Sequence, residues 1–134
     1  SLGLVGSEMC IRDSYSYQVD VYESYCETYG WEMADTFSAR PGFSEHQTGL
    51  TIDCNTIDDA FGQTKEAQWL AEHCADYGFI IRFPDGKEDI TGYQYEPWHI
   101  RYVGVDTAKE IDQLGVSLEE YLGVQSEYTG PWEH

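Results

Sequence analysis

Hydrophobic residues recur at helical spacing in two long segments of the chain. Counted from Tyr15, the apolar positions advance by four, three, four and three residues: Val19, Tyr22, Cys26 and Tyr29. This spacing predicts a helix over residues 15–29 that ends at Gly30, because glycine readily adopts the left-handed conformation of a helix stop. A second helix is predicted over residues 64–77, ending at Gly78, with one apolar side: Ala67, Leu70, Cys74 and Tyr77.

Three other segments show the shorter period of half-buried strands. Apolar and polar residues alternate over residues 50–53 and 79–83 and again after Trp98, where His99, Arg101 and Val103 share one face. Pro97 cannot lie inside a central strand but can precede one. Residues 38–46 contain a Pro-Gly pair, which breaks helix and strand, so they are predicted to form a loop that brings their last residues to a surface.

Two further helices are predicted near the C-terminus. Asp106 can cap a helix that ends at Leu114 and Gly115, and residues 117–120 have the serine and glutamate of a capping box. The chain after Gly123 is expected to be loosely held, with Trp132 as an anchor. The order of helices and strands lacks the regular alternation of a parallel sheet. We therefore predict an α+β fold, a small antiparallel sheet with flanking helices.

Length and composition favour one folded domain. The chain has 134 residues, of which 41% are hydrophobic and 15% aromatic, so it has ample apolar surface to bury. We assign residues 15–134 to a single domain. Residues 1–14 lack an initiator methionine and a clear periodicity, and we interpret them as a foreign-looking or truncated segment without a recognisable export signal.

The charge of the chain excludes some classes of partner. Seven basic and 25 acidic residues give a formal net charge of −18, which repels nucleic acid and anionic lipid surfaces. We therefore expect no nucleic-acid partner, and interpret the charge mainly as a source of solubility. No run approaches the roughly 20 apolar residues that span a bilayer.

The four cysteines do not define a functional site. They are Cys10, Cys26, Cys54 and Cys74, and no two of them form a C-x-x-C pair. Cys54 and Cys74 can be linked in an oxidising compartment, or both can be buried free thiols, and spacing alone does not decide between the two.

Histidines and carboxylates offer the candidate chemistry. A catalytic zinc usually has three protein ligands and one open position. His46 follows the predicted loop and Asp53 ends the strand behind it, while His99 begins another strand with Glu96 three residues before it. Other polar groups are interpreted as packed, surface or solvated side chains: His73, His134, Glu45, Asp58 and Asp59.

Two sequence motifs indicate a resemblance to one known protein family. Residues 44–53 read Ser-Glu-His-Gln-Thr-Gly-Leu-Thr-Ile-Asp and match the S-x-H-x-x-G-x-x-x-D signature of the VanY and VanX peptidases. Residues 96–99 read Glu-Pro-Trp-His and match the E-x-W-H motif of the same group. Residues 77–80, 91–93 and 101–104 are also similar to VanY-type enzymes. The resemblance covers residues 15–122.

The resemblance implies a zinc-dependent D-alanyl-D-alanine carboxypeptidase with the fold shared by the Hedgehog signalling domain. His46, Asp53 and His99 would bind Zn²⁺, Glu96 would be the catalytic base and Ser44 would contact the substrate. That substrate would be the D-Ala-D-Ala end of a peptidoglycan stem peptide. The enzyme would be extracytoplasmic and is expected to be a monomer. A dipeptidase, a cell-wall endopeptidase or an impaired zinc-containing peptide-binding domain are the alternatives.

One departure from the family pattern lies before the first helix. Family members have a Tyr-Arg-Ser motif whose arginine stabilises the reacting carbonyl, whereas here Asp13 precedes Ser14. Arg12 is one position out of register and is the candidate to compensate for it as a substrate-binding residue. Arg40 belongs to a different family position. The resemblance therefore implies a peptidase with weakened oxyanion stabilisation.

Overall fold

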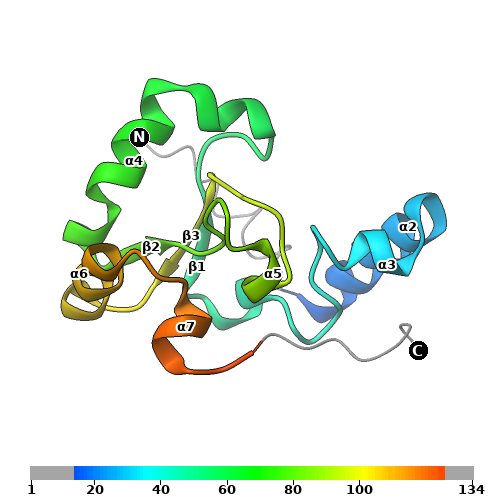
Figure 1. Ribbon diagram of the computed structural model, residues 1–134. Coiled ribbons are helices and arrows are strands. Elements are labelled where there is room, and N and C mark those ends of the chain that lie inside the picture. The colour runs from blue at the N-terminus through cyan, green and yellow to red at the C-terminus, as the bar shows by residue number, and fades with distance from the viewer. Residues whose placement is uncertain (1–13, 126–134) are drawn as a thin grey trace.

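A three-stranded sheet forms the centre of the molecule (Figure 1). The computed structural model describes residues 14–125, so the predictions for Cys10, Arg12, Asp13, Trp132 and His134 lie outside the described residues. The strands are β1 (Thr51–Asp53), β2 (Phe79–Ile81) and β3 (His99–Tyr102), and β3 pairs antiparallel with both neighbours. The predicted α+β architecture with a small antiparallel sheet is confirmed.

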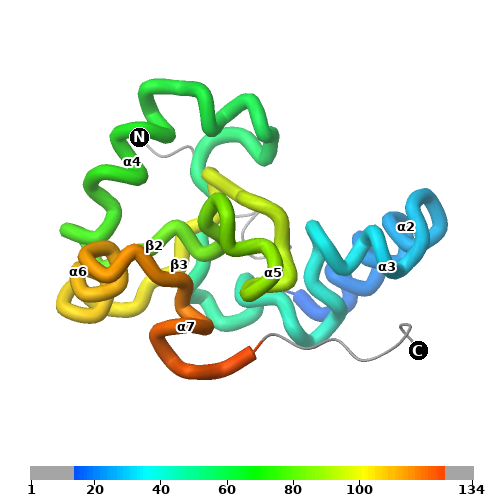
Figure 2. The backbone as a smooth tube through the Cα atoms, viewed as in Figure 1, coloured from blue at the N-terminus to red at the C-terminus, as the bar shows by residue number. Residues whose placement is uncertain are grey.

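The helices lie around this sheet in two groups. Figure 2 shows α2 (Tyr15–Tyr29) and α3 (Trp31–Ala34) on one side, and α4 (Lys65–His73) and α6 (Val105–Leu114) on the other. The shorter elements are α5 (Glu88–Thr91), α7 (Leu118–Leu122) and the 3₁₀ turns η1 (Glu45–Thr48), η2 (Asp59–Gln63) and η3 (Cys74–Tyr77). Within residues 14–125, no helix combines the length and apolar character needed to cross a membrane.

One face of the sheet is apolar, and the other carries the polar residues of β1 and β3 together with Ile80 of β2. Ile52, Ile100 and Ile81 occupy paired positions on neighbouring strands and pack against Leu70 of α4 and the indole of Trp98. Adjacent strand residues point to opposite faces. Asp53 and His99, which pair directly across β1 and β3, therefore point away from this apolar cluster.

A second cluster joins β2 to the C-terminal helices. Ile80 packs there with Ala75, Ala108 and Ile111, and residues of α7 lie against the cluster. The capping box of α7 is present, because the Ser117 side chain accepts from the Glu120 backbone and the Glu120 side chain accepts in return. These contacts fix α7 beside the end of β2.

The predicted helices are confirmed with corrected ends and faces. Residues 64–73 follow the prediction, with Thr64 as the N-cap, but the last predicted turn is the separate 3₁₀ turn η3, which leaves Tyr77 63% exposed. Of the predicted apolar positions in α2, Tyr22 is fully buried whereas Tyr29 is 59% exposed. The prediction that Asp106 caps α6 is wrong, because Gly104 is the N-cap and Asp106 lies in the first turn.

A polar network attaches α2 to the loop before the site. Tyr22 donates a hydrogen bond to Asp35 Oδ1, and Arg40 contacts both oxygens of the same carboxylate at 3.0 and 2.6 Å. Gln18 of α2 donates to the backbone oxygen of Ala39. The exposed helix is thereby held against the loop of residues 38–44.

Cys54 and Cys74 are buried free thiols of the same apolar cluster, one of the two possibilities that the sequence left open. Burial raises the pKa of each thiol to about 11.

Candidate active site

His46, Asp53 and His99 converge from three elements. His46 lies in η1, and Gly49, at a φ of 71°, turns the chain from η1 into β1, which ends at Asp53. The pairing of β1 with β3 places His99 opposite Asp53. One ligand atom from each of the three side chains lies within 4.8 Å of the others. The structure thus brings together the residues that the family resemblance implied as zinc ligands.

The distances within this group identify the atoms that face its centre. His46 Nε2 lies 3.3 Å from Asp53 Oδ2, and His99 Nδ1 lies 3.5 Å from Asp53 Oδ1. The two imidazole rings are 5.3 Å apart between centroids. Two imidazole nitrogens and one carboxylate are a donor set that zinc prefers at catalytic sites, where a fourth position stays open. The residues therefore fit a zinc ion.

Glu96 lies next to this group. Its Oε2 is 3.2 Å from His99 Nδ1, and its side chain is buried. The backbone amide of Glu96 donates to Phe83 and its carbonyl accepts from the His99 amide, so the turn before β3 is fixed at both ends. Glu96 is thereby placed beside the candidate ligands.

A cavity of about 390 Å³ opens over the group. Its wall includes His46, His99, Glu96 and Ser44, whereas Asp53 is absent from the lining. Asp53 therefore lies behind the two histidines, and Glu96 faces the space where a substrate would lie. Residues of α2 also form part of the wall, namely Tyr17, Gln18, Val21 and Tyr25.

Ser44 is buried at the edge of this cavity. It occupies the N-cap position of η1, but its side chain makes no capping hydrogen bond there. Its position in the cavity wall suits a contact with substrate, which stays a prediction.

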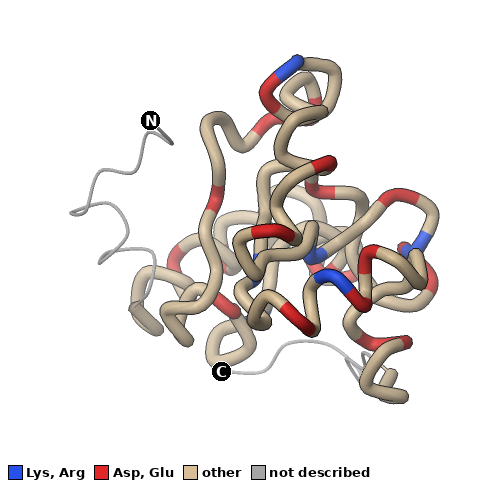
Figure 3. Tube along the Cα trace, turned by 90° about the vertical axis from the view of Figure 1, so that its left-hand side faces the viewer, with Lys and Arg blue, Asp and Glu red and all other residues tan. Residues whose placement is uncertain are grey.

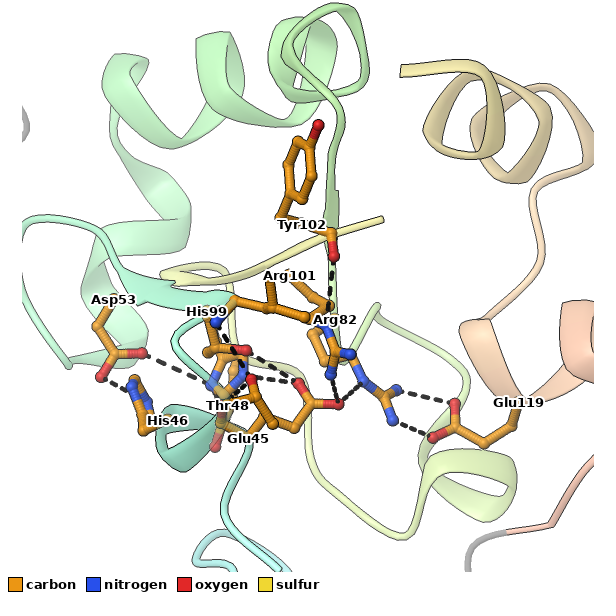
Figure 4. A network of polar contacts seen from close by, with 12 residues as sticks. Glu45, His46, Thr48, Asp53, Arg82, His99, Arg101, Tyr102 and Glu119 are labelled. Atoms are coloured by element: carbon orange, nitrogen blue, oxygen red, sulfur yellow. Dashed lines mark hydrogen bonds and ion pairs between the residues drawn. The ribbon is translucent and has the colours of Figure 1, made fainter. Parts of the chain in front are cut away.

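Glu45 is the clearest correction to the sequence analysis. We interpreted it as a solvated charge, yet its side chain is only 17% exposed and contacts two arginines and His99 (Figure 4). Its Oε1 lies 2.6 Å from Arg82 Nε and 3.0 Å from Arg101 Nη1, and its Oε2 lies 3.5 Å from His99 Nε2. Sequence reasoning missed this because the partners, which lie in or directly after strands, are at least 37 residues from Glu45 in the chain.

Arg82 links Glu45 to the C-terminal region. It donates to Glu119 of α7 at 2.9 and 2.5 Å, and its guanidinium lies over the Phe83 ring at 4.8 Å. Both Arg82 and Glu119 are largely buried, at 11% and 6% side-chain exposure. The only sequence signal was a charged residue in a predicted strand, which does not identify its partner.

Charge interactions shift the pKa values of two members of this network. Burial alone would raise the pKa of Glu45, but the contact with His99 and the charge of Arg82 outweigh it and lower the pKa to about 2. Burial alone would lower the pKa of His99, but its contacts with Glu45 and Glu96 raise it to about 9. The carboxylates around His99 therefore create a site that attracts positive charge.

Other predicted residues lie apart from the site. His73 is on the surface of α4 beside Trp69, as the sequence suggested. Asp58 caps η2 by accepting from the Ala60 amide. Arg40 is engaged with Asp35 and lies over the Trp31 ring, so its guanidinium is committed to the α3 region. Figure 3 shows that Asp and Glu are spread over many segments of the chain, while Lys and Arg are few.

Comparisons with known proteins agree on one family. Residues 11–105 match the family model described as VanY, D-alanyl-D-alanine carboxypeptidase. A D-alanyl-D-alanine carboxypeptidase of Enterococcus faecalis is 45% identical over 92 residues, which cover 69% of this chain and 34% of that protein. The chain therefore spans about a third of that relative's length.

Solved structures show the same fold at high sequence identity. The LdcB LD-carboxypeptidase, whose structure addresses peptidoglycan recognition, is 53% identical with a TM-score of 0.76, over 84% of this chain and 61% of that one. VanYB in complex with D-alanine-D-alanine is 36% identical with a TM-score of 0.73, over 84% of this chain and 67% of that one.

Proposed function

Because this chain belongs to the VanY family of D-alanyl-D-alanine carboxypeptidases, we propose that it is a zinc-dependent carboxypeptidase that removes the terminal D-alanine from peptidoglycan stem peptides. The observation that carries the proposal is the convergence of His46, Asp53 and His99, with Glu96 beside them, at the wall of a cavity. Relatives whose names specify D-alanyl-D-alanine carboxypeptidases support the reaction class.

His46, Asp53 and His99 would hold the zinc ion in this proposal. When bound, zinc would supply Lewis-acid polarisation of the scissile carbonyl and a lowered pKa for a bound water. The protein's own contribution is to keep the two imidazole nitrogens and the Asp53 carboxylate aimed at one point. The antiparallel pairing of β1 with β3 provides this alignment for Asp53 and His99.

Glu96 is proposed to move the protons. Its carboxylate faces the cavity, where it can accept a proton from the attacking water at one oxygen. It can then return that proton to the nitrogen of the departing D-alanine, so that the amide bond breaks and a neutral amine leaves. Ser44, in the same wall, is proposed to contact the substrate end.

A second candidate is an L,D-carboxypeptidase, which releases D-alanine from an L-centre instead of a D-centre. The observation in its favour is the 53% identity to LdcB and also to DacB of Streptococcus pneumoniae D39, against 36% to VanYB. DacB is named as an L,D-carboxypeptidase in a further structure at 48% identity. Both candidates use the same metal site and the same base.

A cell-wall substrate would place the enzyme outside the cytoplasm, and we propose an extracytoplasmic location for this reason. The relative described as recognising peptidoglycan supports this. A monomeric state stays a prediction. The family match begins at residue 11, so the departure at Asp13 falls within the matched region and outside the described residues.

D-alanine release distinguishes the candidates. The purified protein is incubated with three substrates: a pentapeptide ending in D-Ala-D-Ala, the tetrapeptide with one D-Ala removed, and free D-Ala-D-Ala. Release from the pentapeptide supports the D,D-carboxypeptidase, release from the tetrapeptide the L,D-enzyme, and release from the dipeptide a dipeptidase. Chelator should abolish release and added zinc should restore it. Release that persists at full rate after the metal has been removed would reject zinc dependence.

A Glu96→Gln protein is the matched control. It should bind zinc as the unmodified protein does but release D-alanine about 10²–10⁴-fold more slowly. Zinc binding without release by the unmodified protein, on all three substrates, would favour the impaired peptide-binding domain.

A further inference from the structure

Glu45 contacts a candidate metal ligand from the side opposite the metal site (Figure 4). His99 Nδ1 faces Asp53 and Glu96 at 3.5 and 3.2 Å, whereas His99 Nε2 faces Glu45 Oε2 at 3.5 Å. The two ring nitrogens of His99 thus have different neighbours. Nδ1 is directed at the centre of the candidate ligands, and Nε2 is directed at Glu45.

The Glu45 carboxylate is held as an acceptor. Its Oε1 accepts from Arg82 and forms an ion pair with Arg101, and Thr51 donates to its Oε2 at 3.2 Å. An ionised carboxylate has no proton to donate. A neutral His99 that faces this acceptor at 3.5 Å is therefore favoured with its proton on Nε2, which leaves the lone pair of Nδ1 free for a metal ion.

We propose that Glu45 is a positioning residue that fixes the tautomer and ring orientation of His99, so that Nδ1 binds the metal. The inference rests on the proposed function, because it assumes that the group of His46, Asp53 and His99 holds zinc. Glu45 does not contact the reacting atoms in this assignment. It acts only through His99.

The rest of the network keeps Glu45 in place. Arg82, which binds Glu45 Oε1, is itself held by two hydrogen bonds to Glu119 of α7. Arg101 lies two residues after His99 on β3 and binds the same oxygen of Glu45. Glu119 lies after residue 105, where the family match ends, so α7 supports the site from outside the matched segment.

A pair of variants separates orientation of His99 from stability. Glu45→Gln and Glu45→Met are similar in size, and both remove the charge that Arg82 and Arg101 bind. Only the glutamine keeps an oxygen that can accept from His99 Nε2. Comparing the two variants therefore cancels the lost charge and leaves the presence or absence of an acceptor oxygen at position 45 as the difference. Glu72→Ala, an equal charge change on the exposed face of α4, controls for net charge.

Zinc affinity is the readout, measured by competition with a chromophoric chelator at fixed pH, with circular dichroism to establish folding. The Met variant should bind zinc about 10–100-fold more weakly than the Gln variant, the usual cost of losing such an outer partner. Glu72→Ala should match the unmodified protein. Equal affinities for the Gln and Met variants would overturn the inference.

A second measurement needs no variant and stays decisive if both substitutions unfold the protein. In the zinc-loaded protein, ¹⁵N–¹H correlations of the histidine rings should show His99 with its proton on Nε2 and the metal on Nδ1. The reverse assignment would overturn the role of Glu45 even where zinc binds. Failure of the unmodified protein to bind zinc at all would instead reject the proposed function.

Discussion

Replacing Arg82 with methionine should destabilise the protein strongly. Methionine keeps much of the volume but removes the charge that Glu45 and Glu119 share. Glu45 retains Arg101, whereas the buried carboxylate of Glu119 would lose the only ion pair recorded for it among residues 14–125. Leaving one member of a buried ion pair without its partner costs about 3–5 kcal/mol. For a domain of this size, we expect the melting temperature to fall by about 10–20 °C.

The second substitution in this experiment is Glu119→Leu. By itself it should also destabilise the protein, because Arg82 then loses two of its hydrogen bonds. The double variant should be more stable than Arg82→Met alone, since no carboxylate is then buried without a partner at that position. Urea unfolding of the four metal-free proteins, followed by tryptophan fluorescence, measures the coupling. If the two substitutions change the free energy of unfolding additively, Arg82 and Glu119 are not energetically coupled, and the reasoning is refuted.

Other consequences can be tested separately. Glu96→Gln should keep zinc affinity within about twofold but lower turnover by a factor of about 10²–10⁴, the scale of general acid–base catalysis. Metal analysis measures the zinc content, and D-alanine release measures the turnover. A variant that has lost its zinc would contradict the role assigned to Glu96. The lowered pKa of Glu45 stabilises the metal-free fold above pH 4.5 by up to roughly 3 kcal/mol, at about 1.4 kcal/mol per pKa unit. This contribution to the free energy of unfolding should be lost as the pH falls through about 2. If Glu45→Gln loses as much stability in acid as the unmodified protein does, the contribution does not come from Glu45. Cys54 and Cys74, with pKa values raised to about 11, should resist a thiol reagent at pH 8 until urea unfolds the protein, and rapid labelling of both in the folded state would contradict their burial. Asp13→Arg should raise the rate of D-alanine release at least tenfold with unchanged zinc affinity, on the scale of one oxyanion donor. An unchanged rate would show that the absence of the Tyr-Arg-Ser arginine does not limit this protein.

Periodicity predicted the elements that are long enough to show it. The helix at residues 15–29 has the predicted bounds, and the strands at Asp53 and His99 lie where the alternation placed them. The helix α5 and the turn η2 were missed, because four or five residues make barely more than one turn. Tyr77 was assigned to a buried face that the 3₁₀ turn η3 rotates towards solvent.

The candidate site was predictable because its residues lie in two short motifs. Family resemblance supplied the roles of His46, Asp53, His99 and Glu96, and the structure then brought the first three together. The environment of Glu45 was not predictable, because its partner Arg82 is 37 residues away along the chain. A charged residue next to a motif histidine looks the same in sequence whether it is solvated or buried.

The pairing of β1 with β3 makes the chemistry of this protein dependent on strand alignment. Asp53 and His99 face each other, and their immediate neighbours Ile52 and Ile100 form the next pair, directed at the apolar cluster. A slip of β3 by one residue would exchange these faces, burying the imidazole of His99 among isoleucines and turning Ile100 towards the cavity. Zinc would bind only the correctly aligned sheet. The metal would therefore select against misaligned forms during folding, in addition to serving the reaction.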